Sequence, residues 1–166
     1  NTEYIPPHRS PFYISILDEV IVGSFVLQVE AKYTGPIYYH QDLSFFFGWQ
    51  DPAHFYYAHL CATAGDNANT ILIVNEADRR GIAQKQSEST EWIEGRYHTV
   101  QIVRDVESGV IEVYFDNPTT PVITAEDRTF MTGKIGLGSF DDAGRFDNLR
   151  IWSMETSSVK YWMLYE

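Results

Sequence analysis

Residues 98–117, H-T-V-Q-I-V-R-D-V-E-S-G-V-I-E-V-Y-F-D-N, form the clearest pair of strands in the chain. Apolar residues alternate with others in both halves, at Val100 and Ile102 in the first and at Ile111 and Val113 in the second. Because successive side chains of a strand point to opposite faces, this alternation predicts strands with one buried side. The V-E-S-G segment between the halves predicts a hairpin turn.

Similar short runs rich in Val, Ile, Phe and Tyr recur along the chain, separated by Gly, Pro, Asn and Asp. Helical periodicity is nearly absent, and a parallel sheet would require crossover helices. We therefore predict an all-β fold, a two-layer antiparallel sandwich formed by a single domain over residues 1–166. The other strands are expected at residues 12–17, 24–33, 38–49, 54–62, 70–75, 122–125, 133–140, 145–153 and 157–165, with a short one around 81–85.

The composition limits the partners. The net charge of −11 disfavours nucleic acid and an anionic membrane surface, because no basic patch is available to replace counterions. No apolar stretch approaches the ~20 residues that span a bilayer, so we expect no membrane insertion. The chain starts at Asn1 rather than Met, which suits a trimmed form, and we expect a secreted or periplasmic location.

Three stretches together resemble the concanavalin A-like jelly-roll group, which includes laminin-G-like domains, legume lectins and laminarinase-type glycoside hydrolases. They are G-S-F-V-L-Q-V-E-A-K-Y at 23–33, W-I-E-G-R-Y-H-T-V-Q-I-V-R-D at 92–105, which leads into the next strand, and G-K-I-G-L-G-S-F-D-D-A-G-R-F-D-N-L-R-I-W at 133–152. The chain is also similar to secreted bacterial proteins with a D-P-A-H-F-Y-Y segment, here at 51–57. The resemblance implies a jelly roll over nearly the whole chain, but a fold does not transfer an activity.

The resemblance does not extend to the catalytic motifs of the group. Laminarinase-type hydrolases carry an E-x-D-x-x-E strand, and the nearest acidic pairs here, at 18–19 and 141–142, have the wrong spacing. The alginate-lyase branch uses a Q-x-H strand with Arg and Tyr partners, and none of these motifs is intact. Carbohydrate binding is therefore the leading hypothesis, and a polysaccharide-processing enzyme is the alternative.

The candidate binding surface lies in the aromatic stretch at 35–60, where strand parity places polar and apolar side chains on opposite faces. Sugars are bound by aromatic rings and by a few precisely placed polar groups. A solvent-facing, concave sheet face is expected to carry the polar set, with Trp49 stacking at the rim and Arg79 favouring an acidic sugar. The expected carbohydrate-binding residues are His40, Asp42, Trp49, Tyr57, His59, Asn75 and Arg79.

Each of these residues also has a structural interpretation. A role in filling the core explains Trp49 equally well, and Arg79 can be explained as part of a solvated loop. If the chain is instead a lyase or hydrolase, His40 or His59 would act as the general base. A laminin-G-like protein-interaction module is a third alternative, with Tyr161, Trp162 and Tyr165 either as an exposed dock or as an added edge strand.

Two expectations concern metals and the thiol. The resemblance implies a structural calcium ion bound by Asp147, and the alternative is an Asp that bonds turn amides. There is no zinc pattern, because the histidines are scattered and no cysteine pair is present. The single Cys61 cannot form an internal disulfide bond, and its apolar context predicts a buried, inert thiol.

Overall fold

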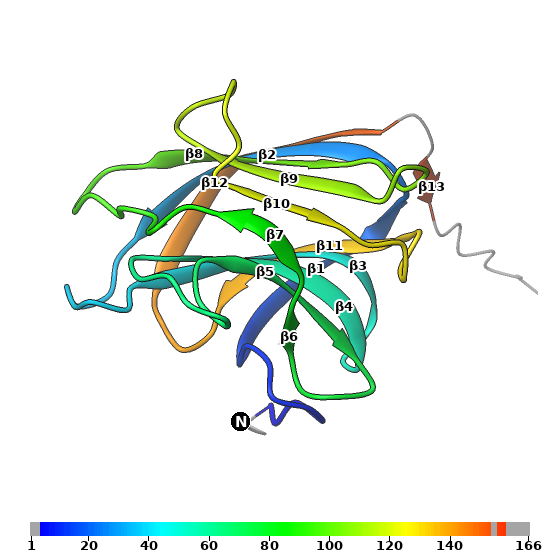
Figure 1. Cartoon of the computed structure of the whole chain (residues 1–166), viewed down its shortest axis with the longest axis horizontal. Coiled ribbons are helices and arrows are strands. Elements are labelled where there is room, and N and C mark those ends of the chain that lie inside the picture. Colours follow the sequence, from blue (N-terminus) through cyan, green and yellow to red (C-terminus); the bar gives the residue numbers. More distant parts are fainter. Residues whose placement is uncertain (1–3, 154–155, 159–166) are drawn as a thin grey trace, which may run out of the picture.

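The computed structural model describes residues 4–153 and 156–158, and these form a sandwich of two antiparallel sheets (Figure 1). Sheet A has the strand order β13-β1-β11-β3-β4-β5-β6, and sheet B has the order β12-β2-β8-β9-β10-β7. No helix occurs in the described ranges. The predicted all-β, two-layer sandwich is thus confirmed.

The strands of each sheet come from both halves of the chain. Sheet A consists of β1 (Tyr13–Val22), β3 (Asp42–Asp51), β4 (His54–Cys61), β5 (Thr70–Asn75), β6 (Arg80–Gly81), β11 (Gly133–Ser139) and β13 (Thr156–Ser158). Sheet B consists of β2 (Phe25–Tyr33), β7 (Ala83–Gln86), β8 (His98–Arg104), β9 (Val110–Phe115), β10 (Ile123–Glu126) and β12 (Gly144–Ser153).

The β8–β9 hairpin forms as its sequence predicts. Ile102 pairs with Val113, and both side chains are fully buried against sheet A. In the turn, the carboxylate of Asp105 accepts a hydrogen bond from the backbone N–H of Glu107 at 3.0 Å. Gly109 closes the turn with φ +84°, a left-handed conformation that glycine adopts without steric cost.

Sheet A is buried on both faces. Its inner face packs Phe45, Phe47 and Tyr56 into the core between the sheets. Its outer face carries a second apolar cluster, the outer-face cluster, made of Phe46, Phe55, Tyr57, Leu72 and Val74. Strands of a sheet that is covered on both sides have nearly continuous apolar sequences. This explains why residues 43–47 and 55–60 lack clear alternation.

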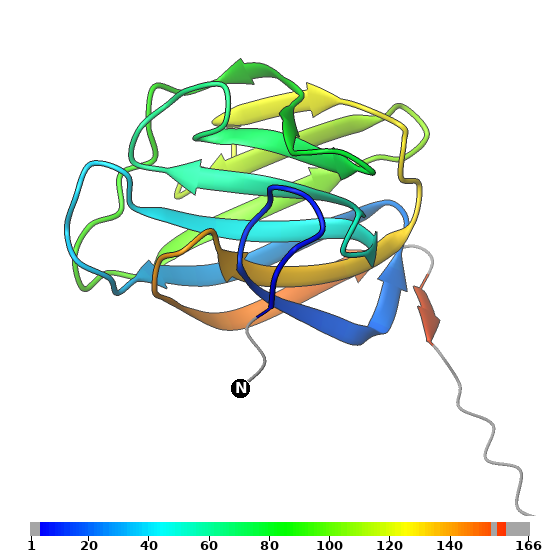
Figure 2. The same cartoon turned by 90° about the horizontal axis from the view of Figure 1, so that it is seen from below.

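The N-terminal segment, residues 4–12, lies against the outer face of sheet A. Figure 1 places it on the side away from sheet B, and Figure 2 shows it crossing that face (dark blue). The backbone N–H of Arg79 donates to the carbonyl of Arg9 at 3.1 Å, and that of Phe12 donates to the carbonyl of Phe140 at 3.0 Å. The segment is thus fixed to both the β5–β6 loop and the β11–β12 loop.

Two predicted strands differ in detail. The strand expected around 81–85 is two short strands, β6 and β7, which carry the chain from sheet A to sheet B. Of the terminal strand expected at 157–165, Ser157 and Ser158 pair with β1, and the remainder, including the proposed dock at Tyr161, Trp162 and Tyr165, lies outside the described residues. Among the described residues, no helix has the length and apolar character to cross a membrane.

Candidate functional site

Five of the seven predicted sugar-binding residues lie together at one end of the outer face of sheet A: His40, Asp42, Tyr57, His59 and Arg79. The β3–β4 register pairs Ser44 with His59 and Phe46 with Tyr57. The predicted site residues of the two strands therefore point to the same, outer face of the sheet. The Nε2 atom of His59 lies 3.2 Å from Oδ1 of Asp42, and Nδ1 of His40 lies 4.0 Å from its Oδ2.

Three of the five are sealed from solvent. The side chains of Asp42 and His59 are 1% exposed, and Tyr57 is 0% exposed. The ring of Phe140 covers His59, with centroids 6.5 Å apart, and the guanidinium carbon of Arg79 lies 4.3 Å from the centre of the Phe140 ring. The expected open surface is therefore closed here, and only His40, at 37% exposed, and half-buried Arg79 can touch a ligand directly.

Trp49 and Asn75 lie at the opposite end of the strands. Trp49 packs its ring against Phe55 and Phe46, at centroid distances of 4.5 and 6.3 Å, as an extension of the outer-face cluster. Asn75 is exposed and pairs with His54 near the β3–β4 turn. The structure does not bring these two residues to the His40 end, because alternation within a strand sets its face but not the position along it.

Buried polar atoms around His59 are incompletely satisfied. Among the described residues, Asp42 Oδ2, Ser44 Oγ and His59 Nε2 are buried without a hydrogen-bond partner. The Nδ1 atom of His59 lies 2.9 Å from the carbonyl oxygen of Asn67. Because a carbonyl only accepts, Nδ1 carries the hydrogen. In the neutral ring, the Nε2 lone pair then faces the carboxylate of Asp42.

The β11–β12 loop brings two further carboxylates to the same place. Ligand oxygens of Asp42, Asp141 and Asp142 all lie within 4.8 Å of one another. Burial, together with the charges of the other two, raises the pKa of the Asp141 carboxyl. Asp142 accepts hydrogen bonds from the Tyr38 hydroxyl at 2.8 Å and from the Asp42 backbone N–H at 2.9 Å. In the sequence, Asp141 and Asp142 stand out only as an acidic pair without the spacing of a hydrolase motif, and no local signal connects Asp142 to Asp42, 100 positions away.

Burial also sets the pKa values of two groups beside this cluster. It raises the pKa of Tyr57 to about 12, although the adjacent Arg79 opposes the shift. The Nη1 group of Arg79 donates to the Tyr57 hydroxyl at 3.3 Å. Cys61 is buried, as predicted, and burial raises the pKa of its thiol to about 11.

A polar cavity of about 400 Å³ opens beside this cluster at the β6 edge of sheet A, and we call it the Arg79 cavity. It is lined by Asp66, Asn67, Thr70, Arg79, Arg80, Gly81, Ala83 and Gln86. Of these, only Arg79 was a predicted site residue. Asp66 and Asn67 lie in the β4–β5 loop and Gln86 lies in β7 of the other sheet, and none of the three carries a sequence signal for binding.

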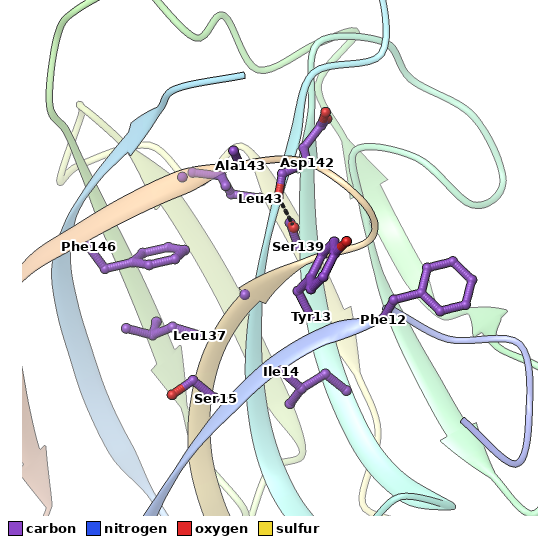
Figure 3. Close-up of a pocket in the computed structure, with 12 residues that line it drawn as sticks. Phe12, Tyr13, Ile14, Ser15, Leu43, Leu137, Ser139, Asp142, Ala143 and Phe146 are labelled. Atoms are coloured by element: carbon purple, nitrogen blue, oxygen red, sulfur yellow. Dashed lines mark hydrogen bonds between the residues drawn. The ribbon is translucent and has the colours of Figure 1, made fainter. Parts of the chain in front are cut away.

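A larger cavity of about 690 Å³ lies at the open margin between the two sheets (Figure 3). Phe146 of sheet B lines it on one side, and Tyr13 and Phe12 line it on the other. Its floor is formed by core side chains such as Leu43 and Leu137. The Ser139 hydroxyl here donates to the carbonyl of Asp142, and most of the lining side chains are apolar, so this space is mainly an opening in the core.

Asp147, the predicted calcium ligand, lies on sheet B, where the β2–β12 pairing is irregular. It is exposed, and its Oδ1 accepts a hydrogen bond from the backbone N–H of Asn148 at 2.8 Å. Asn148 has φ +52° and donates through Nδ2 to Glu30 at 2.8 Å. Calcium binding at Asp147 stays a prediction.

No protein-family model matches this sequence, and no curated protein matches it. Solved structures do resemble it. The carbohydrate binding module CBM66 from Bacillus subtilis superposes with a TM-score of 0.66 at 17% identity, over 87% of this chain and 84% of the module. CG-16, a homodimeric agglutinin from chicken liver, gives 0.56 at 11% identity, and a double mutant of congerin II gives 0.58 at 12%. Each of these two matches covers 84% of this chain and 99% of the other. At such identities the likeness establishes the fold, and the protein has the concanavalin A-like sandwich fold.

Proposed function

We propose that this protein binds a carbohydrate in the Arg79 cavity. The observation that carries the proposal is the lining of that cavity, which combines guanidinium, carboxylate and carboxamide groups from Arg79, Asp66 and Gln86. Planar polar groups of this kind hydrogen-bond pairs of neighbouring hydroxyls. A volume of about 400 Å³ falls within the usual range of small-ligand sites.

Neighbouring side chains hold the guanidinium of Arg79 in one position. Its guanidinium is held between the Tyr57 hydroxyl, at 3.3 Å, and the face of the Phe140 ring. A cation fixed on an aromatic face loses little additional side-chain entropy when it binds a ligand. Arg80 lines the same cavity and adds a second positive charge.

The two arginines lead us to propose an acidic sugar, such as a uronic acid, as the preferred ligand. An arginine pairs with a carboxylate through two parallel hydrogen bonds, which favours this planar group. The protein as a whole has a net charge of −11. A locally basic cavity is therefore the part of its surface that would attract an anionic sugar.

Two further considerations support binding rather than catalysis. Two of the superposed structures are named as a carbohydrate binding module and an agglutinin. His59, one of the two histidines that could serve as the base of a lyase or hydrolase, lies with Asp42 beneath Phe140, and both are 1% exposed. A general base must reach the proton that it removes, and no substrate reaches this pair while the cover is closed.

The test is titration calorimetry with neutral and uronic oligosaccharides, together with assays for new reducing ends and unsaturated products. We expect binding without cleavage, and at least tenfold weaker binding in Arg79→Gln and Asp66→Asn. Arg150→Gln, an exposed arginine of sheet B, is the matched control and should bind like the wild type. Cleavage that His59→Ala abolishes would replace this assignment with a catalytic one. Equal binding in all three variants would remove the site from the Arg79 cavity.

A further inference from the structure

We propose that Asp42, Asp141, Asp142 and His40 form a binding site for a divalent metal cation. One carboxylate oxygen from each of the three aspartates lies within 4.8 Å of the other two, and Nδ1 of His40 lies 4.0 Å from Asp42 Oδ2. Ligand atoms bound to one cation at about 2.0–2.5 Å are separated from one another by roughly 3–5 Å. The three aspartates therefore already stand at the separations of a coordination shell, and His40 lies close enough to Asp42 to complete it with a small movement of its side chain.

The buried Oδ2 of Asp42 provides an observation independent of the clustering. This oxygen has no hydrogen-bond partner, and the side chain is 1% exposed. Its companion Oδ1 is held by the backbone N–H of Phe140 at 3.0 Å, which directs Oδ2 away from that bond. A buried carboxylate oxygen without a partner is costly, and a bound cation would remove that cost.

The Nε2 atom of His59 is a second unsatisfied atom, and it lies beside the same Asp42 carboxylate. Its Nδ1–H donates to the carbonyl of Asn67, so Nε2 presents a lone pair to Asp42 Oδ1 at 3.2 Å. Two electron-rich atoms at this distance repel each other unless positive charge lies close to them. Either a proton on Nε2 or a cation at Asp42 supplies this charge, and only the cation also provides a partner for Oδ2.

Hydrogen bonds around the cluster hold the candidate ligands in place. Asp142 accepts from the hydroxyls of Tyr38, at 2.8 Å, and Tyr33, at 3.1 Å, and from the Asp42 backbone N–H at 2.9 Å. Oδ2 accepts two of these bonds and Oδ1 accepts only one, so Oδ1 keeps a lone pair for a cation. Outer contacts of this kind fix the orientation of metal ligands in known sites.

The donor set indicates the class of ion and its route of entry. Carboxylates together with an imidazole suit a first-row ion such as Mn²⁺ or Zn²⁺, whereas Ca²⁺ takes oxygen donors alone. Asp141 is exposed and His40 is 37% exposed, so an ion can enter from solvent without opening the Phe140 cover. The site is separate from the Arg79 cavity, and it stands whether or not a sugar binds there.

The experiment uses the full chain, treated with a chelator and titrated with MnCl₂ and with ZnCl₂ by calorimetry and thermal unfolding. Wild-type protein should bind one ion, and its melting temperature should rise as the ion is added. Asp141→Asn and His40→Gln should each weaken binding more than about tenfold. Glu126→Gln, which changes an exposed carboxylate on sheet B, is the matched control and should bind the ion as the wild type does.

A second measurement distinguishes a loss of metal binding from a folding defect of the variant. Without metal, Asp141→Asn should unfold at the wild-type temperature or above it, because one of three crowded carboxylates loses its charge. With saturating metal, the wild type should instead unfold at a higher temperature than Asp141→Asn. Absence of binding by the wild type at millimolar Mn²⁺ and Zn²⁺ would overturn the proposal, as would binding that Asp141→Asn and Glu126→Gln retain equally.

Discussion

His59 and Asp42 form a buried pair on the adjacent strands β4 and β3, with Nε2 and Oδ1 3.2 Å apart and both side chains 1% exposed. Neither is replaced easily, because both are buried and each holds a backbone group of a different loop. His59 bonds the Asn67 carbonyl, and Asp42 bonds the Phe140 N–H. Together they connect the β4–β5 loop to the β11–β12 loop through the sheet.

Removal of the imidazole should therefore destabilise the fold. We expect His59→Leu to lower the free energy of unfolding by about 3 kcal/mol at pH 7, since it removes the hydrogen bond to the Asn67 carbonyl and places an apolar side chain against the buried Asp42 carboxylate. Urea denaturation of metal-free protein measures this. The double variant His59→Leu, Asp42→Leu should recover part of the loss. A loss below about 1 kcal/mol in the single variant would mean that water replaces the imidazole.

The Phe140 cover should control the reactivity of His59. In the wild type, diethyl pyrocarbonate should modify His40, which is 37% exposed, and spare His59, which is 1% exposed. Phe140→Ala removes the ring over His59, and modification of that residue should become several-fold faster. Peptide mass spectrometry resolves the two sites. His98, buried at 1% exposed on sheet B, is the internal control and should stay protected in both proteins. Unchanged protection of His59 would place the barrier in the N-terminal segment instead.

Asp127 should contribute to stability in a pH-dependent way. Burial raises the pKa of Asp127, but hydrogen bonds from the Tyr56 hydroxyl and the Thr129 N–H outweigh this and hold the pKa below its usual value. A depressed pKa stabilises the fold above the unfolded value of about 3.9, and this stabilisation is lost as pH falls through the folded pKa. The gap in unfolding free energy between the wild type and Asp127→Asn should thus be larger at pH 7 than at pH 3.

Urea denaturation at both pH values checks this, with Glu94→Gln as the control because it changes an exposed loop carboxylate. The control should show a gap near zero at both pH values. If the Asp127→Asn gap widened at pH 3, the assigned direction of the pKa shift would be wrong.

The glycines of β11 should be required for the close approach of its neighbours. A Cβ added at Gly138 would collide with the backbone carbonyl of Tyr13 in β1, so the two strands would have to move apart. We expect Gly138→Ala to cost about 2 kcal/mol of unfolding free energy. Gly65→Ala is the matched control, since a Cβ there meets nothing within 4 Å, and its effect should stay within about 0.5 kcal/mol. Similar losses in both variants would indicate an effect on the unfolded chain.

Much of the local structure followed from the sequence. The period-two pattern of residues 98–117 predicted the β8–β9 hairpin, and the parity of β3 and β4 placed Asp42, Tyr57 and His59 on one face. Both depend on neighbours within a strand or across a short turn. The alternation of side chains is a property of the extended backbone, so it is readable without any knowledge of distant residues.

The sequence by itself determined the all-β sandwich, the hairpins and the shared face of His59 and Asp42. Only the tertiary structure decided that this face is closed by Phe140 and the N-terminal segment, that Trp49 lies at the far end, and that Asp141 and Asp142 arrive beside Asp42. The physical reason is that strand periodicity sets the direction of a side chain. What covers it depends on contacts between segments about 100 residues apart, such as the 98-residue separation of Asp42 and Phe140.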